Sequence, residues 1–368
     1  MNGDTFRGRT LRIPRRLIVT AAVILVLFSG CLPHSCQREP NKALFAADSL
    51  SRRVAGEAPV DTLEQGPILG GGRTDRLSYP RTVRFVKPGT LAVSDVKRNS
   101  LFLYGEDGTL RREISEPDFS VPYLIGTRSD TLVVYNAESD RVDWVPATAR
   151  RPARSFTFTR PAPETLVYMV ASDTAVYAKV VGQKTGASLF RLTSSGRRVA
   201  EVDLRGPYWR RAGFLRTWGD RLVSLSGFRP VIQTLPLGFR QGARPDSLSL
   251  VGFDSPMLER SFAFARGDAT KPPLLMASAV PVGQRLFVLN LRPGWVQIDV
   301  YSEDGRLERR LVEGQKEGNR NFYPVDIDAR RTDDGYLFAV AVRSPRAQVE
   351  LFHWPARPPQ TPTDDRAP

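Results

Sequence analysis

Short apolar runs separated by turn residues recur over most of the chain. Gly89–Ile114 (GTLAVSDVKRNSLFLYGEDGTLRREI) contains three of them, LAVSD, LFLY and TLRREI. Asp107 and Gly108, between the last two runs, readily adopt the positive φ angles of a tight hairpin, so the pattern predicts three antiparallel strands. Three strands bury too little apolar surface to be stable alone, and we therefore expect the unit to be repeated.

The repeats are present. The turn and first apolar run return at intervals of 41, 43, 47, 64 and 51 residues, starting at Gly89, Asp130, Asp173, Asp220, Gln284 and Gly335. The hairpin returns as well, because Leu101–Ile114 (LFLYGEDGTLRREI) matches Ile298–Leu311 (IDVYSEDGRLERRL). A period of 40 to 50 residues in an all-strand chain is typical of propeller blades. We predict an all-β, six-bladed β-propeller; the alternative is one large β-sandwich.

Each blade needs an innermost strand. The predicted innermost strands are Arg81–Phe85, Pro122–Ile125, Leu166–Val170, Phe214–Trp218, Leu274–Ala277 and Val325–Asp328. After Gln348–Trp354 too few residues remain for another outer strand, so Pro59–Pro67 (PVDTLEQGP) is predicted to complete the last blade and close the ring. The 64-residue interval predicts a longer excursion at Gly238–Ser247.

Two innermost strands have similar preceding residues, TDRLSYPRTV at Thr74–Val83 and GNRNFYPVDI at Gly318–Ile327. In each, an aromatic residue and a Pro lead into the strand. Together with the Asp-Gly hairpins, these segments resemble the NHL-repeat class of six-bladed propellers, over about Gly70 to Trp354. The resemblance implies a fold, and a fold does not by itself define a function.

The N-terminal residues have the layout of a secretory signal. Five Arg precede a twelve-residue apolar run, Leu17–Phe28, which is too short for a comfortable membrane span. The small residues before Cys31 resemble the lipobox of bacterial lipoproteins, in which the Cys is acylated and becomes the new N-terminus; Phe28 stands where that pattern usually has Leu. The alternatives are an uncleaved signal anchor, or a Cys31–Cys36 disulfide beside an ordinary cleavage site.

We therefore predict a lipoprotein-type signal peptide (1–30), a tether (31–58), the propeller (59–356) and a disordered C-terminal tail (357–368). The short stretch Asn41–Arg53 of the tether is compatible with a helix. All three interpretations of the N-terminus place the folded part outside the cytoplasm. We expect a monomer in the bacterial cell envelope, lipid-anchored in the membrane and facing the periplasm or the exterior.

The chain is basic, with a formal net charge of +14, and loss of residues 1–30 with their five Arg and one Asp would leave +10. A basic exported protein can favour anionic lipids or polysaccharides, although a solvated Arg-rich surface is the simpler account. Nucleic acid is not an expected partner, because the compartment is wrong and no aromatic-basic binding motif is present. The chain has two His, His34 and His353, which are too few for a His-based active site at the axis.

Propellers place functional residues on the loops around the central channel. The candidates here are Arg81, Asp95, Tyr123, Asn136, Asn290 and Asp326. Their Asp and Asn oxygens can be interpreted in two ways: they cap strand ends, or they hold Ca²⁺ at the axis as in lactonases resembling regucalcin. The segment Tyr208–Trp218 mixes aromatics with Arg, and Arg210 and Arg211 are open to a role in binding an anionic glycan or a protein.

The sequence supports two hypotheses of function. The first is a non-enzymatic binding or scaffolding module for a protein or glycan partner, without a cofactor or catalytic residues. The alternative is a metal-dependent hydrolase or lyase of the lactonase-like propeller type, with Ca²⁺ in the central channel.

Overall fold

The computed structural model describes residues 49–72, 77–149, 151–266, 268–292, 294–314 and 322–355. The predicted signal peptide, Cys31, most of the tether and the C-terminal tail lie outside these residues.

Sixteen strands form four separate sheets, each built from four consecutive antiparallel strands. The first sheet contains β2 (Pro80–Lys87), β3 (Thr90–Asp95), β4 (Ser100–Gly105) and β5 (Leu110–Ser115). The second contains β6 (Pro122–Arg128), β7 (Thr131–Asn136), β8 (Arg141–Pro146) and β9 (Arg154–Thr157). The third contains β10 (Leu166–Ala171), β11 (Val176–Gly182), β12 (Gly186–Leu192) and β13 (Arg198–Asp203). The fourth contains β14 (Leu215–Trp218), β15 (Arg221–Leu225), β16 (Val231–Pro236) and β17 (Asp246–Ser249).

A fifth sheet has eight strands in the order β18-β19-β20-β21-β1-β24-β23-β22. One half contains β18 (Met276–Val282), β19 (Arg285–Asn290), β20 (Gln297–Tyr301) and β21 (Leu307–Glu313). The other half contains β22 (Tyr323–Arg331), β23 (Gly335–Ser344), β24 (Gln348–Pro355) and β1 (Val60–Leu69). The described strands thus form five sheets, and the prediction of six separate blades is corrected to four separate sheets and one double-sized sheet.

The double-sized sheet exists because β1 pairs on both of its sides. Val60–Leu63 run parallel to β21, whereas Glu64–Leu69 run antiparallel to β24. The predicted strand Pro59–Pro67 therefore does pair with the last strand of the chain, and it also continues the ladder into the preceding group of strands.

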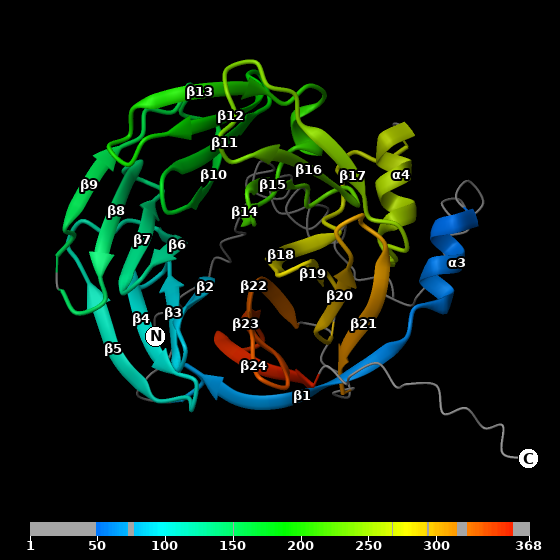
Figure 1. Ribbon diagram of the computed structural model, residues 1–368, viewed down its shortest axis with the longest axis horizontal. Coiled ribbons are helices and arrows are strands. Elements are labelled where there is room, and N and C mark those ends of the chain that lie inside the picture. Colours follow the sequence, from blue (N-terminus) through cyan, green and yellow to red (C-terminus); the bar gives the residue numbers. More distant parts are fainter. Residues whose placement is uncertain are drawn as a thin grey trace, which may run out of the picture. The chain divides into compact units, whose positions relative to one another are not determined.

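The sheets follow one another around a central axis in a propeller arrangement (Figure 1). The first strands of successive groups contact each other in a closed circle, in the order β2, β6, β10, β14, β18, β22 and back to β2. These are the predicted innermost strands; the largest difference is in β18, which is Met276–Val282 and not Leu274–Ala277.

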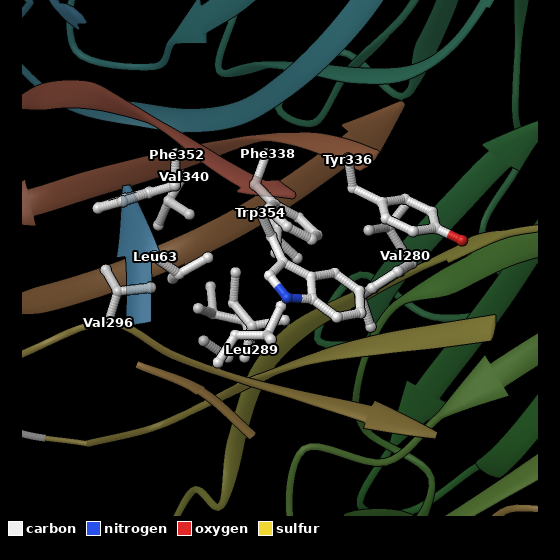
Figure 2. Packing of buried hydrophobic residues seen from close by; sticks show 14 of the residues in the cluster. Leu63, Val280, Leu289, Val296, Tyr336, Phe338, Val340, Phe352 and Trp354 are labelled. Atoms are coloured by element: carbon white, nitrogen blue, oxygen red, sulfur yellow. The ribbon is translucent and has the colours of Figure 1, made fainter. Parts of the chain in front are cut away.

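The burial of each strand follows from its position within its sheet. Every residue of β3 and β4 is buried, because these strands lie between two neighbouring sheets, whereas β5 on the outside is mostly exposed. Figure 2 shows Leu63 of β1 among buried side chains of β23 and β24 such as Phe338 and Trp354. The Phe287 and Phe338 rings join the two halves of the eight-stranded sheet, with centroids 5.0 Å apart in an edge-to-face contact.

Within the described residues, two nine-residue α-helices accompany the strands, α3 (Ser49–Glu57) and α4 (Leu258–Arg266). The helix α3 falls within the predicted tether, yet its Val54 and Ala55 are buried, and Arg310 donates to the Ala55 carbonyl at 2.8 Å. The folded part thus begins before residue 59. Neither helix is long and apolar enough to cross a membrane.

The helix α4 was not predicted. It lies between β17 and β18 and accounts for much of the 64-residue interval. The predicted excursion Gly238–Ser247 is shorter than expected, because its last two residues already belong to β17. Leu258 is fully buried, so α4 is held by tertiary packing.

Replacing Leu63 by Ala is expected to lower the free energy of unfolding by about 2–5 kcal/mol, because buried atoms are lost where one strand joins two groups of strands. Leu63 is 3% exposed. Denaturant unfolding measures the effect. The control is Ile68→Ala on the same strand, where Ile68 is 46% exposed and the change is expected to stay within about 0.5 kcal/mol. Equal losses in both variants would contradict this account of β1.

Candidate functional site

A cavity of about 210 Å³ opens on the central channel, against the innermost strands β2, β6, β10 and β14. Arg and aromatic side chains make up much of its wall. Four Arg line it and no Asp or Glu does; the residues that matter below are Arg81, Arg84, Arg160, Arg216, Tyr123 and Tyr168. We call it the central cavity.

Arg81 and Tyr123 lie on adjacent innermost strands. The Arg81 guanidinium carbon is 5.7 Å from the centroid of the Tyr123 ring, within the range of a cation–π interaction. Within the described ranges no carboxylate forms an ion pair with Arg81. Its charge is therefore available to a ligand.

Tyr168 forms the neighbouring wall. Its ring meets Phe214 edge to face, with centroids 6.0 Å apart. Burial raises the pKa of the Tyr168 hydroxyl to about 12, although the positive charge of Arg81 acts to lower it. Tyr168 is therefore a neutral phenol at neutral pH, and it can donate a hydrogen bond.

Arg160 reaches the central cavity from the loop before β10, and Asp140 fixes it there. Its Nε and Nη2 donate to the two Asp140 carboxylate oxygens at 2.6 Å each, in a bidentate pair. The Tyr135 hydroxyl donates to the same carboxylate at 2.6 Å. Arg160 is thus held rigidly, but Asp140 offsets part of its charge.

Arg84 and Arg216 are held from behind by Asp326. One oxygen of Asp326 accepts from Arg216 at 2.7 Å and from the Ser278 hydroxyl at 2.6 Å. The other oxygen accepts from Arg84 at 2.6 Å and from the Val83 amide at 3.1 Å. The Asp326 carboxylate thus links four innermost strands, β22, β14, β18 and β2.

The charges of this group shift one another's pKa values. Burial alone would raise the pKa of Asp326, but Arg84 and Arg216 hold it below its ordinary value. Burial and the charge of Arg84 lower the pKa of Arg216 to about 10, so it stays charged at neutral pH. Burial raises the pKa of Asp328, which accepts from the Phe85 amide at 2.8 Å.

The six predicted site residues do not converge. Arg81 and Tyr123 line the central cavity, and Asp326 lies behind its wall. Asp95, Asn136 and Asn290 end the strands β3, β7 and β19, where each bonds nearby groups.

The contacts of these three residues are those of strand-end caps. Asp95 accepts from the backbone amides of Lys97 and Arg98, both at 3.1 Å. Asn136 accepts from the Ser120 amide at 3.2 Å, and Asn290 donates to the Asp254 carbonyl at 2.9 Å. These contacts hold nearby loops in place, although the Asn290 Oδ1 is buried without a hydrogen-bond partner.

Sequence reasoning missed Arg84, Arg160, Arg216 and Tyr168. A signal was present for Arg84 and Arg216, since each lies inside a predicted innermost strand, and the run Val325–Asp328 supplies acidic residues. Buried charges are retained when they are paired. A charged residue inside a predicted innermost strand therefore indicates a paired charge at the centre of the ring.

The residues at the axis do not fit a Ca²⁺ site. Ca²⁺ takes six to eight oxygen ligands, but both oxygens of Asp326 already accept hydrogen bonds from guanidinium groups. No cluster of three or more His, Cys, Asp or Glu able to hold a metal ion occurs in the described part of the chain.

No protein-family model matches the sequence, and no curated protein matches it. Solved structures do match in fold. A calcium-binding protein, regucalcin, from Agrobacterium tumefaciens has a TM-score of 0.50 at 12% identity, over 81% of this chain and 96% of that one. A streptogramin B lyase has a TM-score of 0.48 at 13% identity, over 79% and 97% of the two chains. Virginiamycin B lyase from Staphylococcus aureus has a TM-score of 0.46 at 12% identity, over 80% and 89%. At such identities the likeness bears on the fold alone, which is that of β-propeller proteins.

Replacing Asp326 by Asn is expected to lower the free energy of unfolding at pH 7 by about 3–5 kcal/mol, because two buried guanidinium groups lose their counter-charge. Denaturant unfolding measures this, with the exposed Asp220→Asn as the matched control. The pKa of Asp326 is lowered on folding, so its contribution is present above the unfolded value of about 3.9 and is lost as the pH falls through the lower folded value.

The stability difference between wild type and Asp326→Asn should therefore stay constant from pH 7 to 5 and shrink below about pH 4. Asp328 has a raised pKa and the opposite pH dependence. Because Asp328 is present in both proteins, its effect largely cancels in the difference. A difference that grows on acidification would contradict the assignment.

Proposed function

We propose that this protein is a non-enzymatic binding module, a propeller whose central cavity binds an anionic group of a protein or glycan partner. The observation that carries the proposal is the composition of the cavity wall, with four Arg, several aromatic rings and no carboxylate. We propose further that the molecule acts as a monomer.

We propose that the propeller has six blades, two of which are joined in the eight-stranded sheet. The innermost strands form a circle of six, and the eight-stranded sheet divides at β1 into β18–β21 and β22–β24 with β1 itself. In this interpretation β1 is the outer strand of the last blade, and its parallel pairing with β21 fastens that blade to the one before. A rigid ring suits recognition, because a preorganised site loses little conformational entropy on binding.

The chemistry of the central cavity favours a carboxylate or a sulfate attached to a ring. A guanidinium presents a planar fork of donors that matches an oxyanion, and Arg81 has no carboxylate partner in the described ranges. Tyr123 and Tyr168 provide flat surfaces with a polar tip. A volume of about 210 Å³ is below the usual range for a whole small-molecule ligand. The cavity therefore suits one sugar unit or one side chain of a larger partner.

The same wall is a poor site for hydrolysis. The described side chains that line the central cavity include no carboxylate, imidazole or thiol. General acid–base catalysis most often uses such a group near the reacting atom, and the Tyr168 hydroxyl, with its pKa raised to about 12, is a weak acid at neutral pH. The lining therefore supports binding over the lactonase-like alternative.

The binding test uses acidic oligosaccharides and acidic peptides as probes, titrated by calorimetry. Arg81→Gln is expected to weaken binding about tenfold to a hundredfold, because a charge-assisted hydrogen bond is lost. The control is Arg128→Gln, an exposed Arg on the neighbouring strand β6. Unchanged affinity in Arg81→Gln, or ester or lactone hydrolysis that depends on added Ca²⁺, would overturn the proposal.

We also propose that the module is exported and held in the bacterial envelope by an acyl group on Cys31, after removal of residues 1–30. The sequence pattern around Cys31 supports this. Intact mass spectrometry of the native protein should give a chain that begins at Cys31 and carries acyl mass, and Cys31→Ser should release it from the membrane fraction. A native N-terminus without acyl mass would rule out the anchor.

A further inference from the structure

A second group of cations lies outside the central cavity and shares no lining residue with it. Arg210, Arg211 and Arg229 surround a cavity of about 20 Å³, whose wall also includes Ser224 of β15 and Gln233 of β16. This volume holds about one water, so a larger ion would bind at the mouth of the cavity, beside the exposed Arg229. We call it the arginine cluster. Arg210 and Arg211 belong to the aromatic and basic segment Tyr208–Trp218, which the proposed function does not use.

The charges of the arginine cluster are not neutralised within the described part of the chain. None of the three guanidinium groups forms an ion pair there. Burial and the charges of Arg229 and Arg210 lower the pKa of Arg211, although the charge of Asp203 acts to raise it. Burial and the charge of Arg210 also lower the pKa of Arg229. The three positive charges are thus held close together, and their repulsion destabilises the folded state. A bound anion would offset this repulsion.

Donors remain free for a ligand. The Arg210 Nε is buried without a hydrogen-bond partner and is closed to a ligand, whereas the terminal nitrogens of Arg210 donate to no group in the described part of the chain. Arg211 uses its Nε and Nη2 on the Arg205 carbonyl, which fixes the plane of its guanidinium and leaves Nη1. Buried donors without partners are rare, and each calls for an explanation.

A buried lysine lies behind the same cavity. Lys179 is 0% exposed, and its Nζ donates to the Ser224 hydroxyl at 3.1 Å and to the Leu225 carbonyl at 2.9 Å. Burial and the charge of Arg211 hold the pKa of Lys179 well below its usual range. Because Ser224 accepts from Lys179, its own hydroxyl hydrogen is directed elsewhere and can serve a ligand in the cavity.

We propose that the arginine cluster is a binding site for a compact oxyanion, either inorganic phosphate or sulfate or the terminal phosphate of a larger molecule. Three guanidinium groups and one hydroxyl supply charge-assisted donors from several directions around one small volume, as such an anion requires. The bound anion also offsets the repulsion among the three Arg. The site is separate from the central cavity, so each can be removed without the other.

The first experiment uses inorganic phosphate as the probe, with chloride at equal ionic strength as the reference. Phosphate should bind saturably in calorimetry and should raise the unfolding temperature, because a ligand that binds only the folded state stabilises it. Arg229→Gln is expected to weaken the affinity about tenfold or more. Arg229 is exposed, so this variant should fold.

Two variants serve as controls. Arg240→Gln removes an exposed Arg from the same region of the chain, between β16 and β17, and should leave phosphate binding unchanged. Arg81→Gln should weaken binding of the acidic probes in the central cavity and leave phosphate binding unchanged, which separates a failure of this proposal from a failure of the proposed function. Equal phosphate affinity in wild type and Arg229→Gln, or no saturable binding above chloride, would overturn the proposal.

The source of the oxyanion is tested with a soluble sugar phosphate and with phosphatidylcholine vesicles that contain or lack phosphatidic acid. Competition of the sugar phosphate with inorganic phosphate supports a soluble ligand. Binding to phosphatidic acid vesicles that is lost in Arg229→Gln supports a lipid headgroup. If neither phosphate ester competes with inorganic phosphate, the terminal phosphate of a larger molecule is excluded as the ligand. Inorganic phosphate is then the ligand of the arginine cluster.

Discussion

The buried carboxylate of Asp326 is the interaction on which the centre of the molecule depends. It joins strands that are far apart in the sequence, because its partners come from β2, β14 and β18. Two of those partners, Arg84 and Arg216, also form part of the central cavity wall. A single acid thus sets the relative positions of the innermost strands and the orientation of two cationic side chains. The fold and the candidate site cannot be altered independently at this point.

Local patterns in the sequence were enough to predict the strands, and they were not enough to predict the site. The Asp-Gly hairpins and the apolar runs depend on residues within one blade, and they appear in the structure where the sequence placed them. Arg84 and Asp326 are 242 residues apart in the sequence. No local sequence pattern predicts that two such distant residues form a pair. The helix α4 was missed for a related reason, since its position depends on packing of Leu258 in the core.

The two cationic sites are close neighbours, although they share no lining residue. Tyr168 lines the central cavity, and its ring centroid is 5.2 Å from the Nζ of Lys179. Lys179 in turn bonds Ser224, which lines the arginine cluster. One aromatic ring and one lysine thus separate them. A change in the charge of Lys179 acts on both sites through a medium of low polarity, where electrostatic effects are strong.

The strand β1 also governs when the ring can close during synthesis. Glu64 pairs with His353, so one of the first described strands finds its partner only in the last one. A ribosome has to complete nearly the whole chain before this ladder forms, and contacts of such long sequence separation form slowly. Until then the edges of β21 and β24, which both pair with β1 in the finished sheet, stay unpaired. Closure of the eight-stranded sheet is therefore a late step of folding, and the free edges of β21 and β24 can pair with other chains before it occurs.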